Sequence, residues 1–97
     1  MGRKPVPEIH FRIRWPDASV QRCYSPSTVA EEFFAAGDSY PVPDFVDRSR
    51  EALAEASERV RRIRGFGCVR AAAQFADIQA RARSFDDGQV TVEGFER

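Results

Sequence analysis

The sequence has little of the two residue types on which metal sites and disulfide scaffolds depend. Its 97 residues include two cysteines, Cys23 and Cys68, and a single histidine, His10. Two cysteines are too few for a disulfide-stapled fold, and no Cys-x-x-Cys pair is present to begin a zinc site. We therefore expect free thiols in a reducing compartment, and neither a bound metal nor a cofactor.

Net charge and long apolar runs are lacking as well. Fifteen basic residues balance fifteen acidic ones, so the chain has no overall electrostatic field that would attract nucleic acid or an anionic membrane. No apolar run is long enough to cross a bilayer, and residues 1–8 lack the apolar stretch of a signal peptide. These absences predict a soluble cytoplasmic protein that has neither a nucleic-acid partner nor a membrane partner.

The composition is that of one small globular domain. Hydrophobic residues make up 42% of the chain and charged residues 31%, so a single core can form without a metal or a disulfide. Pro5 and Pro7 discourage regular structure near the start of the chain. We therefore predict a flexible arm over residues 1–7 and a single domain over residues 8–97.

Residues 8–15 alternate strictly between polar and apolar side chains, which is the pattern of a half-buried β-strand. The apolar set is Ile9, Phe11, Ile13 and Trp15, and the polar set is Glu8, His10, Arg12 and Arg14. Pro16 and Asp17 favour a turn after this strand, and residues 20–24 predict a second strand, so the two form a hairpin. The facing of the second strand stays open, because either choice buries a polar residue or exposes an apolar one.

Three helices are predicted in the middle of the chain. The first begins near Ser25, which is well placed as an N-cap before Pro26, while Ser27 is the alternative cap. Gly37 is expected to end this helix in a left-handed conformation. Residues 38–43 are then predicted to be extended, because each proline disfavours the helical conformation of the residue before it.

Two longer helices, over about residues 43–64 and 68–85, are expected to pack as an antiparallel hairpin. The apolar seam of the first comprises Val46, Leu53, Ala56, Val60 and Ile63, with Ser49 in one slot. The packing side of the second comprises Val69, Ala72, Phe75, Ala76, Ile78, Ala82 and Phe85. The many alanines of the second helix permit a close approach to the first.

Residues 89–95 alternate once more and predict a last strand, with Val90 and Val92 facing inward. The predicted order of elements is therefore β-β-α-α-α-β. A sheet with one apolar face must cover that face, and the helices are the only cover available. We predict an α+β two-layer sandwich, in which a small, mostly antiparallel sheet is covered on one face by helices.

No arrangement in the sequence predicts catalysis. Ser25 lacks the G-x-S-x-G motif of a nucleophile elbow, and the glycines before Cys68 fall short of a phosphate-binding loop. The helix predicted after Cys23 is expected to lower the pKa of that thiol, but free cysteines are most often small buried hydrophobes. We therefore assign no catalytic residue, and a redox pair of Cys23 with Cys68 stays an open alternative.

Residues that could bind a ligand or a partner lie in several parts of the chain. Arg12 and Arg14 form an outward row that is either a solvated strand face or a cationic surface for an acidic partner. Residues 38–45 form a proline-stiffened link that either packs against the domain or docks a partner. The candidate residues are Arg12, Arg14, Cys23, Tyr24, Ser25, Tyr40, Phe45 and Cys68.

Four stretches, taken in order, resemble a family of small bacterial nitrogen-starvation response proteins. They are RWPD at residues 14–17, CYSPS at 23–27, YPVPDFVDRSREALAEASERV at 40–60 and GFGC at 65–68. The resemblance covers about residues 8–95. The chain departs from the family at Ala18, where Pro-Asp-Gly is usual and where alanine resists a positive φ. Residues 2–6 also resemble an addition before the usual start.

This resemblance implies a genomic context rather than an activity. Genes of the family lie beside those for a nitrilase, a radical-SAM protein, an acetyltransferase-like protein and a flavin-dependent oxidoreductase, in a cluster linked to nitrogen limitation and cyanide assimilation. It supplies no catalytic residue. We therefore expect a non-catalytic accessory protein that binds an enzyme of that nitrile pathway or associates as a homodimer. The alternative is a small-molecule enzyme or redox sensor that uses Cys23 or Cys68.

Overall fold

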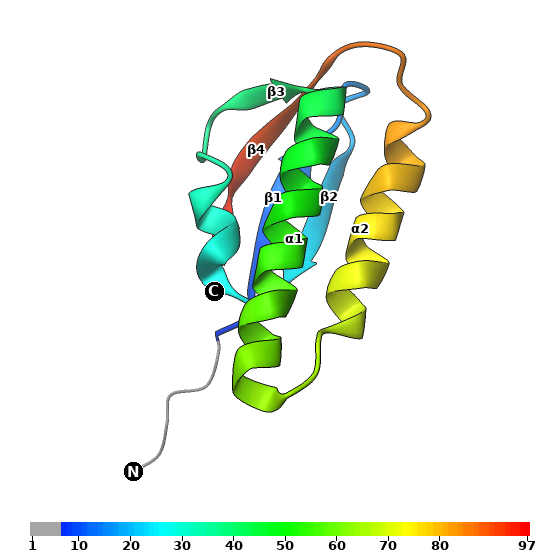
Figure 1. The fold of residues 1–97 in the computed structure, drawn as a ribbon. Coiled ribbons are helices and arrows are strands. Elements are labelled where there is room, and N and C mark those ends of the chain that lie inside the picture. The colour runs from blue at the N-terminus through cyan, green and yellow to red at the C-terminus, as the bar shows by residue number, and fades with distance from the viewer. Residues whose placement is uncertain (1–6) are drawn as a thin grey trace.

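The computed structural model describes residues 7–97, so the predicted arm over residues 1–7 lies outside the described residues except for Pro7. Two long helices lie side by side across one face of a four-stranded sheet (Figure 1). Within residues 7–97, no helix lies over the other face of the sheet. The predicted α+β two-layer sandwich is therefore confirmed.

The sheet is antiparallel throughout, with the strand order β2-β1-β4-β3. The strands are β1 (Ile9–Arg14), β2 (Val20–Ser25), β3 (Ser39–Pro41) and β4 (Gln89–Glu96). The apolar set of β1 is fully buried against the helices, as the alternation predicted. Val90 and Val92 of β4 are also buried, which confirms the facing of the last strand.

The first hairpin settles which side of β2 faces the core. Phe11 pairs with Cys23 and Arg12 with Arg22, so Cys23 points inward and Arg22 outward. The polar residue that this choice places on the inner side is Gln21, whose Oε1 accepts a hydrogen bond of 2.8 Å from Trp15 Nε1. The partner explains why burying part of a polar side chain is tolerated here.

The hairpin turn holds a backbone conformation that its sequence disfavours. Ala18 has a φ of 72°, in the left-handed region that favours glycine. The turn is held by Asp17, whose Oδ1 accepts the backbone N–H of Ser19 at 3.0 Å. The hydrogen bonds from Ser19 hold the pKa of Asp17 below its ordinary value. The predicted role of Asp17 in the turn is confirmed.

The prediction of an α-helix after Ser25 is wrong. The chain forms only a 3₁₀ helix, η1 (Thr28–Glu32), and its cap is Ser27, whose Oγ accepts the N–H of Val29. Ser25 instead ends β2 and donates its hydroxyl to the carbonyl of Ser27 at 2.7 Å. Gly37 lies in the turn before β3, where its N–H donates to the carbonyl of Val92 at 2.7 Å.

The long helix α1 (Val42–Arg64) ends at Gly65, which has a φ of 88°. Its buried residues are Val42, Phe45, Ser49, Ala52, Leu53, Ala56 and Val60. Ile63 was predicted to belong to this seam but is 44% exposed. The last turn of α1 extends past the ends of the strands (Figure 1), and Ile63 stays partly exposed among residues 7–97.

The helix α2 (Val69–Ala82) runs antiparallel to α1, as predicted, but its predicted packing side is only partly correct. Its buried residues are Ala71 and Ile78, with Phe75 and Ala82 partly buried beside them. Val69, Ala72 and Ala76 were predicted to pack but are exposed. The side chain of Gln74 contributes to this orientation, because its Oε1 accepts the N–H of Tyr24 at the open edge of β2, at 2.9 Å.

Aromatic rings fill the space between the two layers. The Trp15 ring lies edge-on to Phe45 at 5.7 Å and stacks on Phe85 at 5.5 Å, measured between ring centroids. Phe34 contacts both Phe11 and Phe45, each at 5.4 Å. Such pairs add about 0.5–1.5 kcal/mol each to the stabilisation from burial.

Between residues 7 and 97, no helix combines the length and the apolar composition needed to span a lipid bilayer. The same part of the chain brings no three His, Cys, Asp or Glu side chains together as potential metal ligands.

Candidate functional site

Several residues singled out from the sequence are core residues. Cys23, Ser25 and Phe45 are fully buried, and Tyr40 is almost so. The Tyr40 hydroxyl accepts the N–H of Ala35 at 2.9 Å. The two aromatic side chains of residues 38–45 therefore pack into the domain and offer a partner almost no surface in this conformation.

Burial raises the pKa of Cys23 to about 12, and the nearby carboxylate of Asp77 adds to the rise. This direction is opposite to the one expected from a helix start, because no α-helix follows Cys23 and the thiol lies in the core. At neutral pH the group is a thiol, which is a poor nucleophile. Both cysteines are free, so the redox pair is not formed in this structure.

Cys68 lies where the two helices and the edge of the sheet meet. It caps the start of α2, and its backbone N–H donates to Ser57 Oγ of α1 at 2.9 Å. Its Sγ lies 4.0 Å from the hydroxyl of Tyr24, and the Arg70 guanidinium lies 3.8 Å from the centre of the Tyr24 ring. Burial raises the pKa of Tyr24 to about 12, with Cys68 as a second cause.

Arg12 and Arg14 lie on the outer sheet face, which is formed by the outward side chains of β1, β2 and β4. Arg12 and Arg22 both bind the carboxylate of Glu96, at 3.0 and 2.7 Å, and Arg14 binds Glu93 at 2.6 Å. The hydrogen bond from Arg22 is the main reason why the pKa of Glu96 lies below its ordinary value. The row is therefore matched by carboxylates of the same face, rather than being a bare cationic surface.

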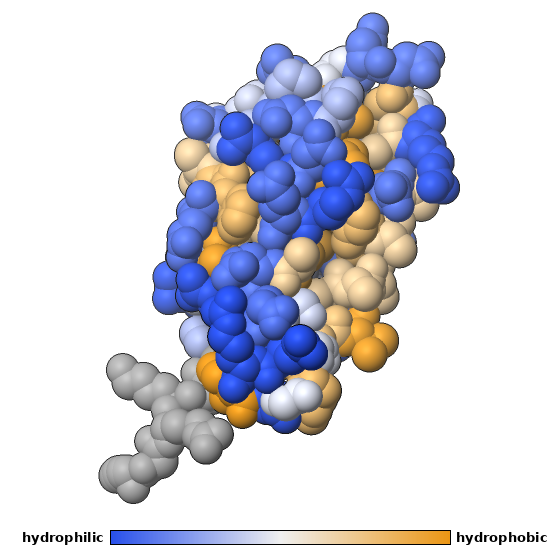
Figure 2. Space-filling model, viewed as in Figure 1, coloured by the Kyte–Doolittle hydropathy of each residue, from blue (hydrophilic) through white to orange (hydrophobic). Residues whose placement is uncertain are grey.

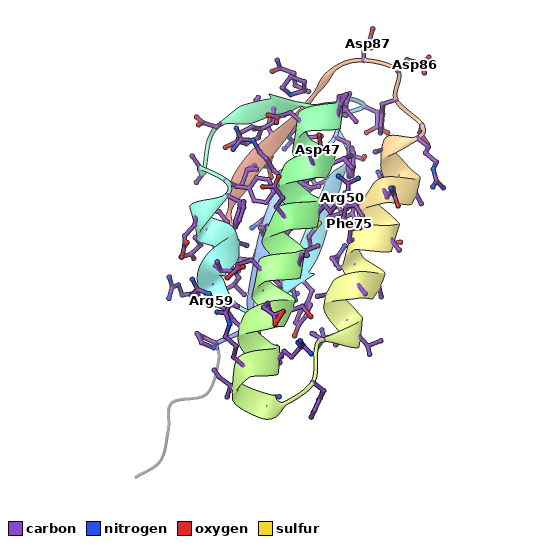
Figure 3. The ribbon with its side chains drawn as sticks, viewed as in Figure 1. Asp47, Arg50, Arg59, Phe75, Asp86 and Asp87 are labelled. Carbon is purple, nitrogen blue, oxygen red and sulfur yellow. The ribbon has the colours of Figure 1, made fainter. Side chains whose placement is uncertain are left out.

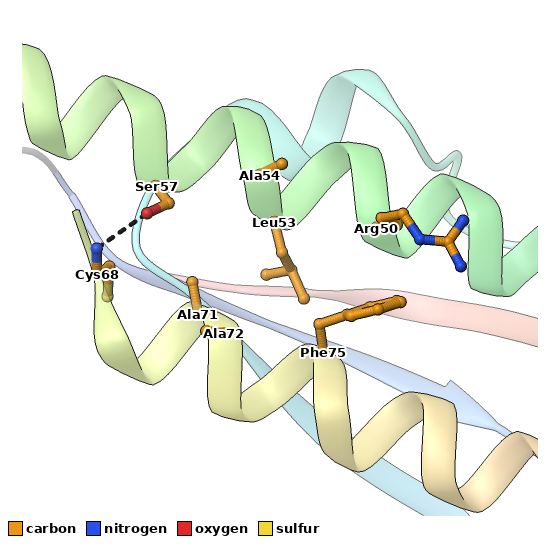
Figure 4. A pocket seen from close by; sticks show the side chains of 8 residues that line it. All are labelled: Arg50, Leu53, Ala54, Ser57, Cys68, Ala71, Ala72 and Phe75. Atoms are coloured by element: carbon orange, nitrogen blue, oxygen red, sulfur yellow. Dashed lines mark hydrogen bonds between the residues drawn. The ribbon is translucent and has the colours of Figure 1, made fainter.

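A groove of about 260 Å³ lies between α1 and α2 on the side away from the sheet (Figure 4). It is mostly apolar, and its lining residues are Arg50, Leu53, Ala54, Ser57, Cys68, Ala71, Ala72 and Phe75. The Arg50 guanidinium lies 5.2 Å from the centre of the Phe75 ring, and it is bound at 2.7 Å by Asp47 (Figure 3). Figure 4 shows Leu53 and Phe75 pointing toward each other across the space between the helices.

Large apolar side chains are exposed at one end of this groove. Val69 is 83% exposed and Phe66 is 66% exposed, and both lie at or beside the connection between the helices. Ala72 and Ala76 continue the exposed apolar surface along α2. In Figure 2 apolar surface lies over α2 and the groove, while α1 is largely hydrophilic. We call the groove, together with Phe66 and the exposed apolar side of α2, the α1–α2 face.

The α1–α2 face was missed by sequence reasoning, which assigned Val69, Ala72 and Ala76 to the core. The sequence feature that could have revealed this face is the width of the apolar arc around α2. Ala71, Phe75 and Ile78 already supply one buried stripe, so further apolar residues on α2 exceed what a helix with one buried side requires.

The arrangement can bind more readily than it can catalyse. The groove contributes van der Waals contact and a few polar groups at its rim. Its thiol, Cys68, is partly exposed but has no histidine beside it among residues 7–97.

Comparison with known proteins adds one finding. Searches of curated proteins and of solved structures found no match to this chain. A family model described as "Nitrogen starvation-induced protein NitG" matches residues 10–95, which extend from β1 to β4. The chain therefore belongs to the family of nitrogen starvation-induced proteins that this model describes.

Proposed function

We propose that this chain is an accessory protein of the nitrogen-starvation response that docks a protein partner on its α1–α2 face. The observation that carries the proposal is the exposure of Val69 and Phe66 beside a mostly apolar groove. Clustered exposed apolar side chains at a groove are typical of interaction sites. Family membership supports the role in starvation.

The shape of the groove favours a helical partner. Two antiparallel helices leave a straight channel between them, and the apolar side of a third helix can lie in such a channel. Burying a valine or a phenylalanine side chain contributes about 1.5–3 kcal/mol. Part of this gain offsets the loss of translational and rotational freedom on association, so Val69 and Phe66 together support a reversible complex rather than a permanent one.

We further propose that the partner belongs to a cytoplasmic nitrile or cyanide assimilation pathway, or is a second copy of this chain. The pathway is an expectation from the family resemblance, and the starvation response is its broader setting. A cysteine-based enzyme or sensor would depend on Cys68, since the raised pKa and burial of Cys23 disfavour a thiolate there. Unchanged growth of a Cys68→Ser strain on nitrile or cyanide would remove that alternative.

Affinity capture from nitrogen-starved cells tests the docking face. The wild-type chain is compared with Val69→Glu, and Val20→Glu serves as a matched control because Val20 is 45% exposed on the outer sheet face. Wild type and Val20→Glu are expected to capture the same proteins, while Val69→Glu loses at least one of them. Equal capture by all three chains overturns the proposal, provided that circular dichroism shows each to be folded.

A further inference from the structure

We infer that a second copy of this chain packs on the exposed apolar side of α2, which is one part of the α1–α2 face, with the two α2 helices antiparallel about a two-fold axis. This inference rests on the proposed function and names its partner. The exposed stripe that would form the contact runs through Val69, Ala72, Ala73 and Ala76.

Charges beside this stripe are of both signs, and this selects the second copy. Arg70 and Asp77 are both exposed, and they lie on one side of α2 because seven residues are close to two helical turns. Among residues 7–97, Asp77 forms no ion pair. Arg70 pairs only with Glu8, at 3.9 Å, and its guanidinium lies 3.8 Å from the centre of the Tyr24 ring. A uniformly acidic or basic partner would match one of these charges and repel the other. An antiparallel copy matches both.

The pairing of these charges fixes a register. In an antiparallel helix pair related by a two-fold axis, each side of one helix meets the same side of the other. If Arg70 lies opposite Asp77 of the second copy, symmetry places Asp77 opposite Arg70, and the helices cross near residue 73. Alanines then meet alanines at the crossing, where small side chains allow the axes to approach to about 8 Å. Val69 of each copy lies over Ala76 and Ala80 of the other.

The available area makes the dimer a reversible one. At about 1.5 Å per residue, the 14 residues of α2 span about 21 Å. A contact along one helix of this length is smaller than the roughly 1,200 Å² of total buried surface at which stable interfaces begin. We therefore expect association that depends on concentration, in the micromolar range or weaker.

A charge-swap experiment on the full chain tests both the partner and the register. Sedimentation equilibrium is measured for the wild type, Arg70→Asp, Asp77→Arg and an equimolar mixture of the two variants. Each variant alone places like charges opposite each other twice, so its dissociation constant is expected to rise on the order of tenfold. The mixture restores both pairs and is expected to associate within about threefold of the wild type. Asp38→Arg, on a turn beside the opposite edge of the sheet from α2, is the control and should match the wild type.

A wild-type chain that stays monomeric at high micromolar concentration overturns the inference, as does a mixture that associates no better than its components. The proposed function is separable from these outcomes. If the wild type is monomeric while Val69→Glu still loses a captured protein, the face docks a different protein and only the inference falls. If Val69→Glu changes neither sedimentation nor capture, the proposed function falls as well.

Discussion

The two outer surfaces of the sandwich differ in how complete they are. On the outer sheet face, Glu96 binds Arg12 and Arg22, so the polar side chains satisfy one another. On the α1–α2 face, Val69 and Phe66 remain exposed beside an apolar groove. An antiparallel sheet with one solvated polar face is ordinary, whereas a helix that is apolar on two sides is not. The contrast supports the proposal that a partner covers part of the α1–α2 face.

The largest expected effect is the difference in reactivity between the two thiols. With a maleimide at pH 8, Cys68 at the groove should react readily, while Cys23 should be protected by a factor on the order of 10³ or more, because it must first be exposed by unfolding. Intact-mass spectrometry and peptide mapping measure both rates. In denaturant the two rates should converge. Similar rates in the native protein would contradict the assignment of Cys23 to a closed core.

The second prediction separates the two apolar stripes of α2. Ile78→Ala removes a fully buried side chain between the layers and is expected to cost about 2–4 kcal/mol of unfolding free energy. Val69→Ala removes a side chain that is 83% exposed and should cost less than about 0.5 kcal/mol in the dilute protein. Urea denaturation measures both. A comparable cost for the two would show that Val69 is already packed.

A comparison of β1 with α2 shows what the sequence could and could not predict. The alternation of residues 8–15 marked β1 and its buried side, because a strand with one buried face has an unambiguous period of two. In α2, alanines occur on both sides, so composition left the rotation of the helix undetermined. The structure selects one rotation through contacts made far along the chain, such as the bond from the N–H of Tyr24 to Gln74.

The prediction for the region between β2 and α1 was wrong for a related reason. Cap chemistry at Ser27 serves a 3₁₀ turn as well as an α-helix, so the local signal was correct but incomplete. Strand β3 depends on the pairing of Tyr40 with Val90, which lies fifty residues further along the chain. No local sequence pattern predicts a contact over that distance. The groove could not be predicted for the same reason, since it is formed by two helices and the connection between them.

The third prediction concerns the turn that joins β1 to β2. Ala18→Gly should stabilise the protein by about 1 kcal/mol, because glycine adopts a φ of 72° without steric strain. Ala54→Gly, at an exposed position in the middle of α1, is the matched control and should destabilise by about 1 kcal/mol. Thermal unfolding of both variants compares them, and a loss of stability in Ala18→Gly would contradict the predicted strain.

The smallest expected effect tests whether the outer sheet face really satisfies its own charges. Because the folded pKa of Glu96 is lowered below 4.5, its ion pairs stabilise the protein above pH 4.5, and this stabilisation is lost as the pH falls through the folded pKa. Glu96→Gln should therefore be slightly less stable than the wild type at pH 7, and this difference should shrink as the pH falls below 4.5. Glu51→Gln, on an exposed residue that forms no ion pair within residues 7–97, should show no such dependence. If urea denaturation across this range gives the same difference at every pH, the carboxylate of Glu96 contributes nothing through its arginines, and the face is merely solvated rather than internally paired.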